Sequence, residues 1–147
     1  MYGHIHHHFP RAPQELLAQL EGVWTSTIAD TMGRHGVMMP EIRPIFEPIR
    51  VVGVAFTVLN YPNDNITTHK ALTMVQPGDV LVIDEGRENN TGSFGHNMSL
   101  QARNRGIAGF VSNGCMRDIR EGRKPLEIIF GDNWVDTALQ GKVQEFK

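Results

Sequence analysis

Three charged side chains follow a glycine turn in the segment NGCMRDIRE, residues 113–121. Arg117 carries a planar guanidinium, which binds a carboxylate through two parallel hydrogen bonds. Asp118 and Glu121 are the hard oxygen ligands that a magnesium-like ion prefers. The segment is therefore a candidate site for an anion and a divalent metal ion. It also fits a solvated first helical turn, where acids favour the helix dipole, so the residue types alone leave both interpretations open.

A second anion-binding feature is the start of a helix predicted over residues 93–106, with Ser93 as its cap and Gly106 at its end. A helix start offers unpaired backbone N–H groups and a partial positive charge, which suit a carboxylate or a phosphate. Gly95 would let a ligand approach the backbone closely. The residues expected to bind the ligand in this first turn are Gly95, His96, Asn97 and Met98.

Strands and helices alternate along the sequence. Mostly apolar runs rich in β-branched residues predict buried strands at residues 49–60, 79–86 and 107–114. Spaced apolar residues predict helices at 13–22, 25–36, 65–79 and 93–106, with Thr25 or Ser26 as the N-cap of the second. This alternation predicts an α/β fold with parallel crossovers. Because parallel strands end at the same edge of a sheet, one pocket is expected to hold both charged features.

Composition narrows the class of protein. The chain has 147 residues, 40% of them hydrophobic, which fits one domain with its own core. A formal net charge of −2 without a basic run argues against nucleic acid and anionic membranes as partners. Cys115 is the single cysteine, so no internal disulfide is expected, and the sequence has no stretch of membrane-spanning length and no signal-peptide core. We expect a cytoplasmic protein, with residues 1–12 as a His-rich tail and residues 13–147 as the domain.

Five segments and one acid, in order along the chain, resemble the RraA-like family. They are GVMMPEIRPI (36–45), RVVGVAFTV (50–58), PGDVLVID (77–84), FGHNM (94–98), ARNRGIAGFVSNGCMRD (102–118) and the acid Glu121. That family includes 4-hydroxy-4-methyl-2-oxoglutarate/4-carboxy-4-hydroxy-2-oxoadipate aldolases, which also decarboxylate oxaloacetate. It also includes the regulator of ribonuclease E activity, which binds protein and is not an enzyme.

The resemblance implies a swivelling α/β/β-type single domain with a mixed, largely parallel sheet, assembled as a trimer or hexamer with pockets between subunits. In the aldolase branch the arginine binds a small 2-oxo acid and the following aspartate supports a divalent metal, Mg²⁺ or Mn²⁺. Carried over by position, Arg117 and Asp118 are the expected catalytic residues, and Asp118 and Glu121 the expected metal-site residues. The amides of 95–98 would hold the substrate carboxylate. A non-catalytic binding protein is the alternative that the family leaves open.

Three departures from the family pattern bear on catalysis. His96 stands where aldolase-like members usually have an acid, and Asn113 stands where an Asp usually precedes the glycine. The domain is also expected to be short at its C-terminus, because further strands would follow in the family. The retained Arg117 and Asp118 favour the lyase, and the departures favour the binding protein.

Overall fold

The computed structural model describes residues 4–38, 40, 42–44, 50–86, 93–116 and 134–137, with only the backbone described at 43–44 and 134–137. The helices in these ranges are α1 (Gln14–Leu20), α2 (Thr25–Thr31), α3 (Ile66–Leu72) and α4 (His96–Asn104). The strands are β1 (Ile42–Pro44), β2 (Val54–Leu59), β3 (Asp79–Asp84), β4 (Gly109–Ser112) and β5 (Trp134–Thr137). None of these helices is long and apolar enough to cross a membrane.

The strands form one sheet in the order β1-β5-β4-β3-β2. The pairs β2–β3, β3–β4 and β4–β5 are parallel, and β1 pairs antiparallel with β5. This confirms the predicted α/β class with a mixed, largely parallel sheet. β1 and β5 were not expected from the sequence, because their segments lack the long apolar runs of the other three strands.

Each predicted helix forms, but every one is shorter than its sequence pattern. Gly106 follows the C-cap of α4 as predicted, with φ 71°, whereas the predicted N-caps are wrong. α2 follows Trp24, and neither Thr25 nor Ser26 caps it, because both already lie inside the helix. Gly95 rather than Ser93 is the N-cap of α4. The Ser93 hydroxyl instead donates a hydrogen bond to Glu85, so a contact distant in sequence replaces the local cap.

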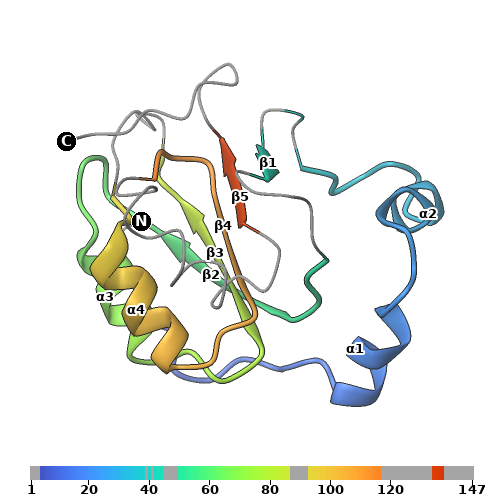
Figure 1. Cartoon of the computed structure of the whole chain (residues 1–147), viewed down its shortest axis with the longest axis horizontal. Helices are drawn as coiled ribbons and strands as arrows, with labels where there is room; N and C mark the ends of the chain where they lie inside the picture. The colour runs from blue at the N-terminus through green and yellow to red at the C-terminus, as the bar shows by residue number, and fades with distance from the viewer. Residues whose placement is uncertain are drawn as a thin grey trace.

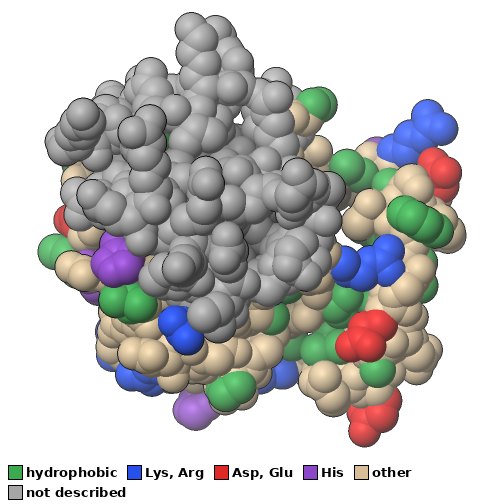
Figure 2. Space-filling model, in the orientation of Figure 1, with side chains coloured by type: hydrophobic (Ala, Val, Ile, Leu, Met, Phe, Trp, Pro, Cys, Tyr) green, Lys and Arg blue, Asp and Glu red, His purple; other side chains and the backbone are tan. Residues whose placement is uncertain are grey.

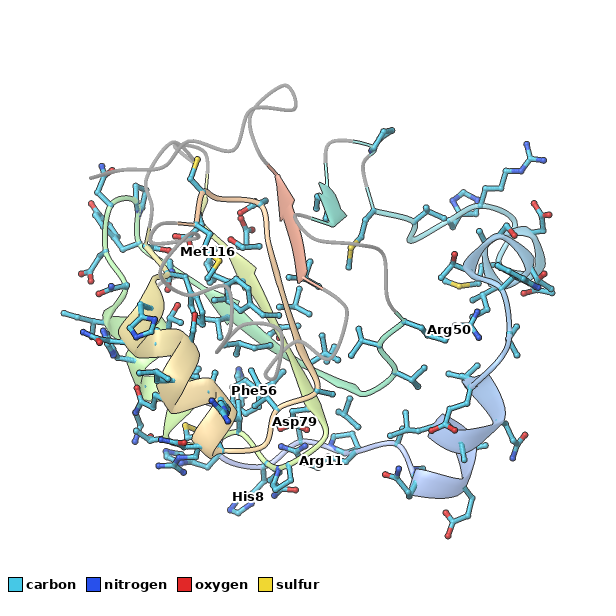
Figure 3. The ribbon with its side chains drawn as sticks, viewed as in Figure 1. His8, Arg11, Arg50, Phe56, Asp79 and Met116 are labelled. Carbon is cyan, nitrogen blue, oxygen red and sulfur yellow. The ribbon has the colours of Figure 1, made fainter. Side chains whose placement is uncertain are left out.

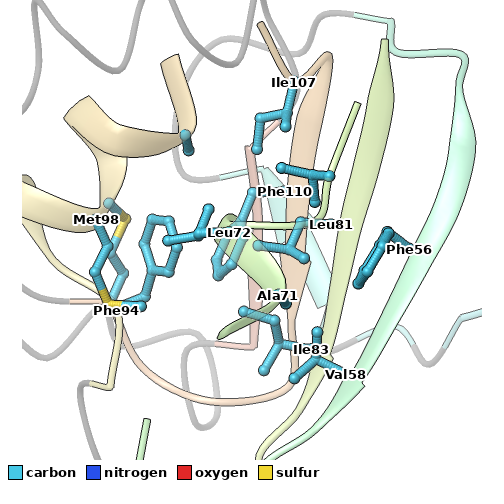
Figure 4. Packing of buried hydrophobic residues seen from close by; sticks show 13 residues of the cluster. Phe56, Val58, Ala71, Leu72, Leu81, Ile83, Phe94, Met98, Ile107 and Phe110 are labelled. Carbon is cyan, nitrogen blue, oxygen red and sulfur yellow. The ribbon is translucent and has the colours of Figure 1, made fainter. Parts of the chain in front are cut away.

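The apolar core lies between the parallel strands and the helices α3 and α4, which cover one face of the sheet (Figure 1). Phe94, which precedes α4, stacks on Phe110 of β4 with ring centroids 3.9 Å apart. Met98 extends from the first turn of α4 into the same cluster (Figure 4). Because Leu72, Leu81 and Phe110 are fully buried, burial of apolar surface fixes α3 and α4 on the sheet.

Helices α1 and α2 lie beside the sheet and bury no residue (Figure 1). Large apolar side chains of this part remain on the surface: Leu16 is 53% exposed, Trp24 73% and Met32 52%. Figure 2 shows hydrophobic side chains on this part of the molecule. An apolar surface of this kind is typical of a contact with another chain.

Residues 4–12, interpreted from the sequence as part of a tail, contact the sheet. The Arg11 guanidinium forms an ion pair with the buried carboxylate of Asp79 and lies 4.7 Å from the centroid of the Phe9 ring. Phe9 packs edge-on against Phe56, with ring centroids 5.5 Å apart. These contacts hold the segment against β2 and the beginning of β3.

Candidate functional site

Three of the four parallel strands, β2, β3 and β4, end at one edge of the sheet, as the sequence pattern predicts. Asn60 follows β2, Glu85 follows β3 and Asn113 follows β4. Beyond this edge, Phe94 and Met116 pair through an isolated parallel β-bridge. Each precedes a predicted site residue in the sequence, Gly95 in one case and Arg117 in the other, so the bridge places the residue before Gly95 next to Met116, the last described residue before Arg117.

The first half of the site is the beginning of α4. No side chain caps the helix at Gly95, and the first backbone bond of the helix runs from the Ser99 amide to the Gly95 carbonyl oxygen at 3.0 Å. Gly95 is buried, His96 is half-buried and Asn97 is exposed. Met98 turns its side chain into the core, so only its backbone can serve a ligand. Backbone N–H groups at an uncapped helix start suit an anion, and substrate binding at this position stays a prediction.

The second half, Arg117, Asp118 and Glu121, lies outside the residues that the structure describes. The described chain leads up to it: Asn113 and Gly114 turn the chain at the end of β4, and Cys115 and Met116 are buried. Met116 lies at the end of the sheet opposite to Asp79 (Figure 3).

A buried carboxyl group that sequence inspection missed lies between Ser93 and Gly114. Glu85 is 1% exposed, and its two oxygens accept hydrogen bonds from different segments. One accepts from the Ser93 hydroxyl, and the other from the Asn60 side-chain amide at 3.0 Å. The available signal was the pair of acids Asp84 and Glu85 directly after an apolar strand.

Asn60 and Asn113 extend this polar network across the strand ends. The Asn60 oxygen accepts bonds from the hydroxyls of Thr67 and Thr68 in α3. The Asn113 oxygen accepts a bond from the Glu85 amide at 2.7 Å, and its amide group donates to Asp84 at 2.7 Å. The network therefore links β2, β3, β4 and α3 at one edge.

Burial raises the pKa of the Glu85 carboxyl above its ordinary value of 4.5. The nearby charge of Asp84 raises it further, while the hydrogen bonds from Ser93 and Asn60 oppose the shift because they favour the ionised form. No ion pair to Glu85 occurs among the described residues. The Glu85 carboxyl therefore binds its proton more tightly in the folded protein than in the unfolded chain.

A candidate metal site and a pocket also bear on ligand binding. In the described part of the chain, no group of three or more His, Cys, Asp or Glu residues could hold a metal ion, so the expected metal rests on Asp118 and Glu121. A pocket of about 630 Å³ lies between residues 4–9, β2 and α3, lined mainly by apolar side chains such as Phe9 and Met74. Residues 95–98 do not line it, so it is separate from the predicted substrate site.

Comparison with known proteins gives a single family. The sequence matches the family model described as RraA-like: Aldolase/RraA over residues 25–133. A protein from Halalkalibacterium halodurans with the provisional name 4-hydroxy-4-methyl-2-oxoglutarate aldolase is 34% identical over 110 residues. The match includes 75% of this chain and 52% of that relative, so the chain spans about half the length of the relative.

Solved structures agree with the fold. Streptomyces coelicolor RraAS2, described as an unusual member of the RNase ES inhibitor RraA protein family, superimposes with a TM-score of 0.67 at 27% identity, covering 78% of this chain and 61% of that chain. An uncharacterized protein from Pseudomonas syringae pv. tomato superimposes with a TM-score of 0.69 at 24% identity, covering 94% of this chain and 62% of that chain. The second likeness shows the fold alone.

The raised pKa of Glu85 makes stability depend on pH. As pH rises above about 4.5, the unfolded chain loses this proton before the folded protein does, so the wild type loses stability until the pH exceeds the folded pKa. Glu85→Gln carries no such proton. The free energy of unfolding of the wild type relative to Glu85→Gln should therefore fall as pH rises from about 4.5 through the folded pKa of Glu85, measured by urea unfolding. A difference that stays constant over this range would contradict the assignment.

Proposed function

The chain belongs to the RraA-like family, and on that premise we propose that it is a divalent-metal-dependent lyase acting on 2-oxo acids. The reactions are retro-aldol cleavage of 4-hydroxy-2-oxo acids, which releases pyruvate, and decarboxylation of oxaloacetate. The bridge between Phe94 and Met116 carries the proposal, because it sets the helix start next to the segment that continues into Arg117. The provisional aldolase name of the relative at 34% identity supports the same reaction class.

The chain's own residues would bind and orient the substrate. The backbone N–H groups of 95–98 would hold its carboxylate at the start of α4. Arg117 would bind the same end of the 2-oxo acid and offset the negative charge that develops on the pyruvate part as the C3–C4 bond breaks. Asp118 and Glu121 are oxygen donors of the type that suits Mg²⁺ or Mn²⁺. When bound, such a metal ion polarises the C2 carbonyl and the carboxylate.

A non-catalytic regulatory role is the second candidate. It is favoured by the likeness to RraAS2, whose description names an RNase ES inhibitor family, and by the absence of an acid at positions 96 and 113. In this role the surface of the protein would bind a ribonuclease or another protein, and the helix start would need no ligand. Retention of Arg117 and Asp118 argues for the lyase, because protein binding at a distant surface does not require them.

Pyruvate release separates the lyase from the regulatory role. A panel of 4-hydroxy-2-oxo acids plus oxaloacetate, assayed with Mg²⁺ or Mn²⁺, should give pyruvate, and a chelator should abolish the release. Asp118→Ala should reduce activity by at least about 100-fold because it removes a proposed metal-site carboxylate. Asp64→Ala, which changes a carboxylate in the turn before α3, is the matched control and should retain activity. Release that is insensitive to chelator and to Asp118→Ala would exclude the proposed mechanism.

A second prediction concerns His96, which replaces the usual acid of the family. A carboxylate attracts a hard ion more strongly than neutral imidazole does, whereas imidazole suits Mn²⁺, Zn²⁺ or Ni²⁺ better. His96→Glu should therefore strengthen Mg²⁺ binding in a calorimetric titration and raise lyase activity. His69→Glu in α3 is the control for an added charge at a histidine position. If His96→Glu and His69→Glu leave Mg²⁺ affinity equally unchanged, position 96 does not face the metal.

We further propose that the protein forms a homo-oligomer, a trimer or hexamer, which buries the exposed apolar side chains of α1 and α2. Light scattering at micromolar concentration should give a mass of at least three chains. The double variant Leu16→Glu/Trp24→Glu should dissociate the assembly, because it places two charges on that surface. Gln19→Glu, which adds a charge to an exposed polar position of α1, should leave the mass unchanged. A wild-type monomer would refute the proposal.

A further inference from the structure

We propose that Glu85 is the positioning residue of the 2-oxo acid site: its carboxyl group sets the start of α4 relative to the end of β4. The effect of Glu85 on catalysis rests on the proposed function, whereas its effect on the positions of the two segments does not. Glu85 touches neither substrate nor metal in this proposal. It acts through the two segments that carry the binding groups.

The first segment is held through Ser93. Its hydroxyl donates to one Glu85 oxygen, and Gly95, whose carbonyl accepts the first helical bond, follows two residues later. The Ser93 carbonyl oxygen also accepts a bond from the Asn65 amide at 2.9 Å. The segment before the helix is therefore fixed at both its side chain and its backbone, which sets the direction of the N–H groups at 95–98.

The second segment is held by close packing at Gly114. A Cβ atom at this position would overlap with the Cγ atom of Glu85 and lie 3.2 Å from its carboxyl carbon. Only glycine lets the turn after β4 lie directly on the Glu85 side chain. Because Arg117 follows three residues after Gly114, displacement of this turn would displace the segment that leads into Arg117, which the proposed function assigns to binding of the 2-oxo acid.

The opposite end of β3 provides a comparison within the same strand. Asp79 is also 1% exposed, but the Arg11 guanidinium balances its charge and the Gln76 amide donates to it at 2.8 Å. Figure 3 shows Asp79 and Arg11 far from Met116. Asp79 thus holds the N-terminal segment, whereas Glu85, whose side-chain partners among the described residues are the neutral Ser93 and Asn60, holds the site.

The test compares Glu85→Leu, which removes both acceptors at similar volume, with Glu85→Gln, which can accept from Asn60 and donate to Ser93. Amide hydrogen exchange at 94–99 and 114–116 should become faster in Glu85→Leu, relative to amides of α3, and should be restored in Glu85→Gln. Asp79→Asn is the matched control and should leave both segments unchanged. Ser93→Ala, a milder change that keeps the fold, should speed exchange at 94–99 only.

The kinetic arm measures the same variants with the best substrate of the panel. Glu85→Leu should raise KM about tenfold or more with a smaller change in kcat, because misplaced binding groups weaken substrate orientation, and Glu85→Gln should restore KM. Unchanged exchange in Glu85→Leu would overturn the proposal. The proposal would also be overturned if Glu85→Gln behaved like Glu85→Leu, because the charge of Glu85 and not its hydrogen bonds would then position the two segments. A wild type without lyase activity would refute the proposed function, and the exchange measurement would still decide the role of Glu85.

Discussion

Parallel pairing of β2, β3 and β4 is the constraint on which the site depends. Their register places Leu59 beside Asp84 and Ile83 beside Ser112, so the three strands end together. The chain must leave the sheet three times within a small area and still satisfy its backbone groups. The Asn60 amide continues the ladder to the Asp84 carbonyl at 2.8 Å, and the side chain of Asn113 accepts from the Glu85 amide. Polar side chains after each strand are therefore part of the fold and of the site.

Because the polar groups at the strand ends are buried, leaving any of them unpaired costs free energy. A buried donor or acceptor without a partner costs about 1–3 kcal/mol, so Asn60 and Glu85, both almost fully buried, restrict the arrangement to the one that pairs them. The raised pKa of Glu85 indicates that its hydrogen bonds do not fully offset the desolvation of its ionised form. Burial of Glu85 thus lowers the free energy of unfolding at neutral pH, while its hydrogen bonds fix the geometry next to the helix start. This combination is common at functional sites.

The sequence predicted the parts that depend on local apolar pattern. The runs at 49–60, 79–86 and 107–114 predicted β2, β3 and β4, and the parallel rule predicted convergence of residues 95–98 with the end of β4. It did not predict the role of Ser93, because a serine before an apolar helix is normally a cap, and only the fold brings Glu85 within reach. β1 and β5 were missed because short strands depend on their neighbours in the sheet more than on their own composition.

The structure explains why Asn113 replaces the usual Asp of the family, so this departure counts less against the lyase. Its oxygen accepts from the Glu85 amide, which leaves its NH₂ group to donate to the Asp84 carboxylate at 2.7 Å. An ionised Asp at this position could not donate, and two carboxylates at that distance would repel each other. The asparagine therefore matches the polar strand ends of this chain and is not in itself a sign that catalysis has been lost. The other departure, His96, replaces an acid by an imidazole, so the distinction between lyase and binding protein rests more on position 96 than on position 113.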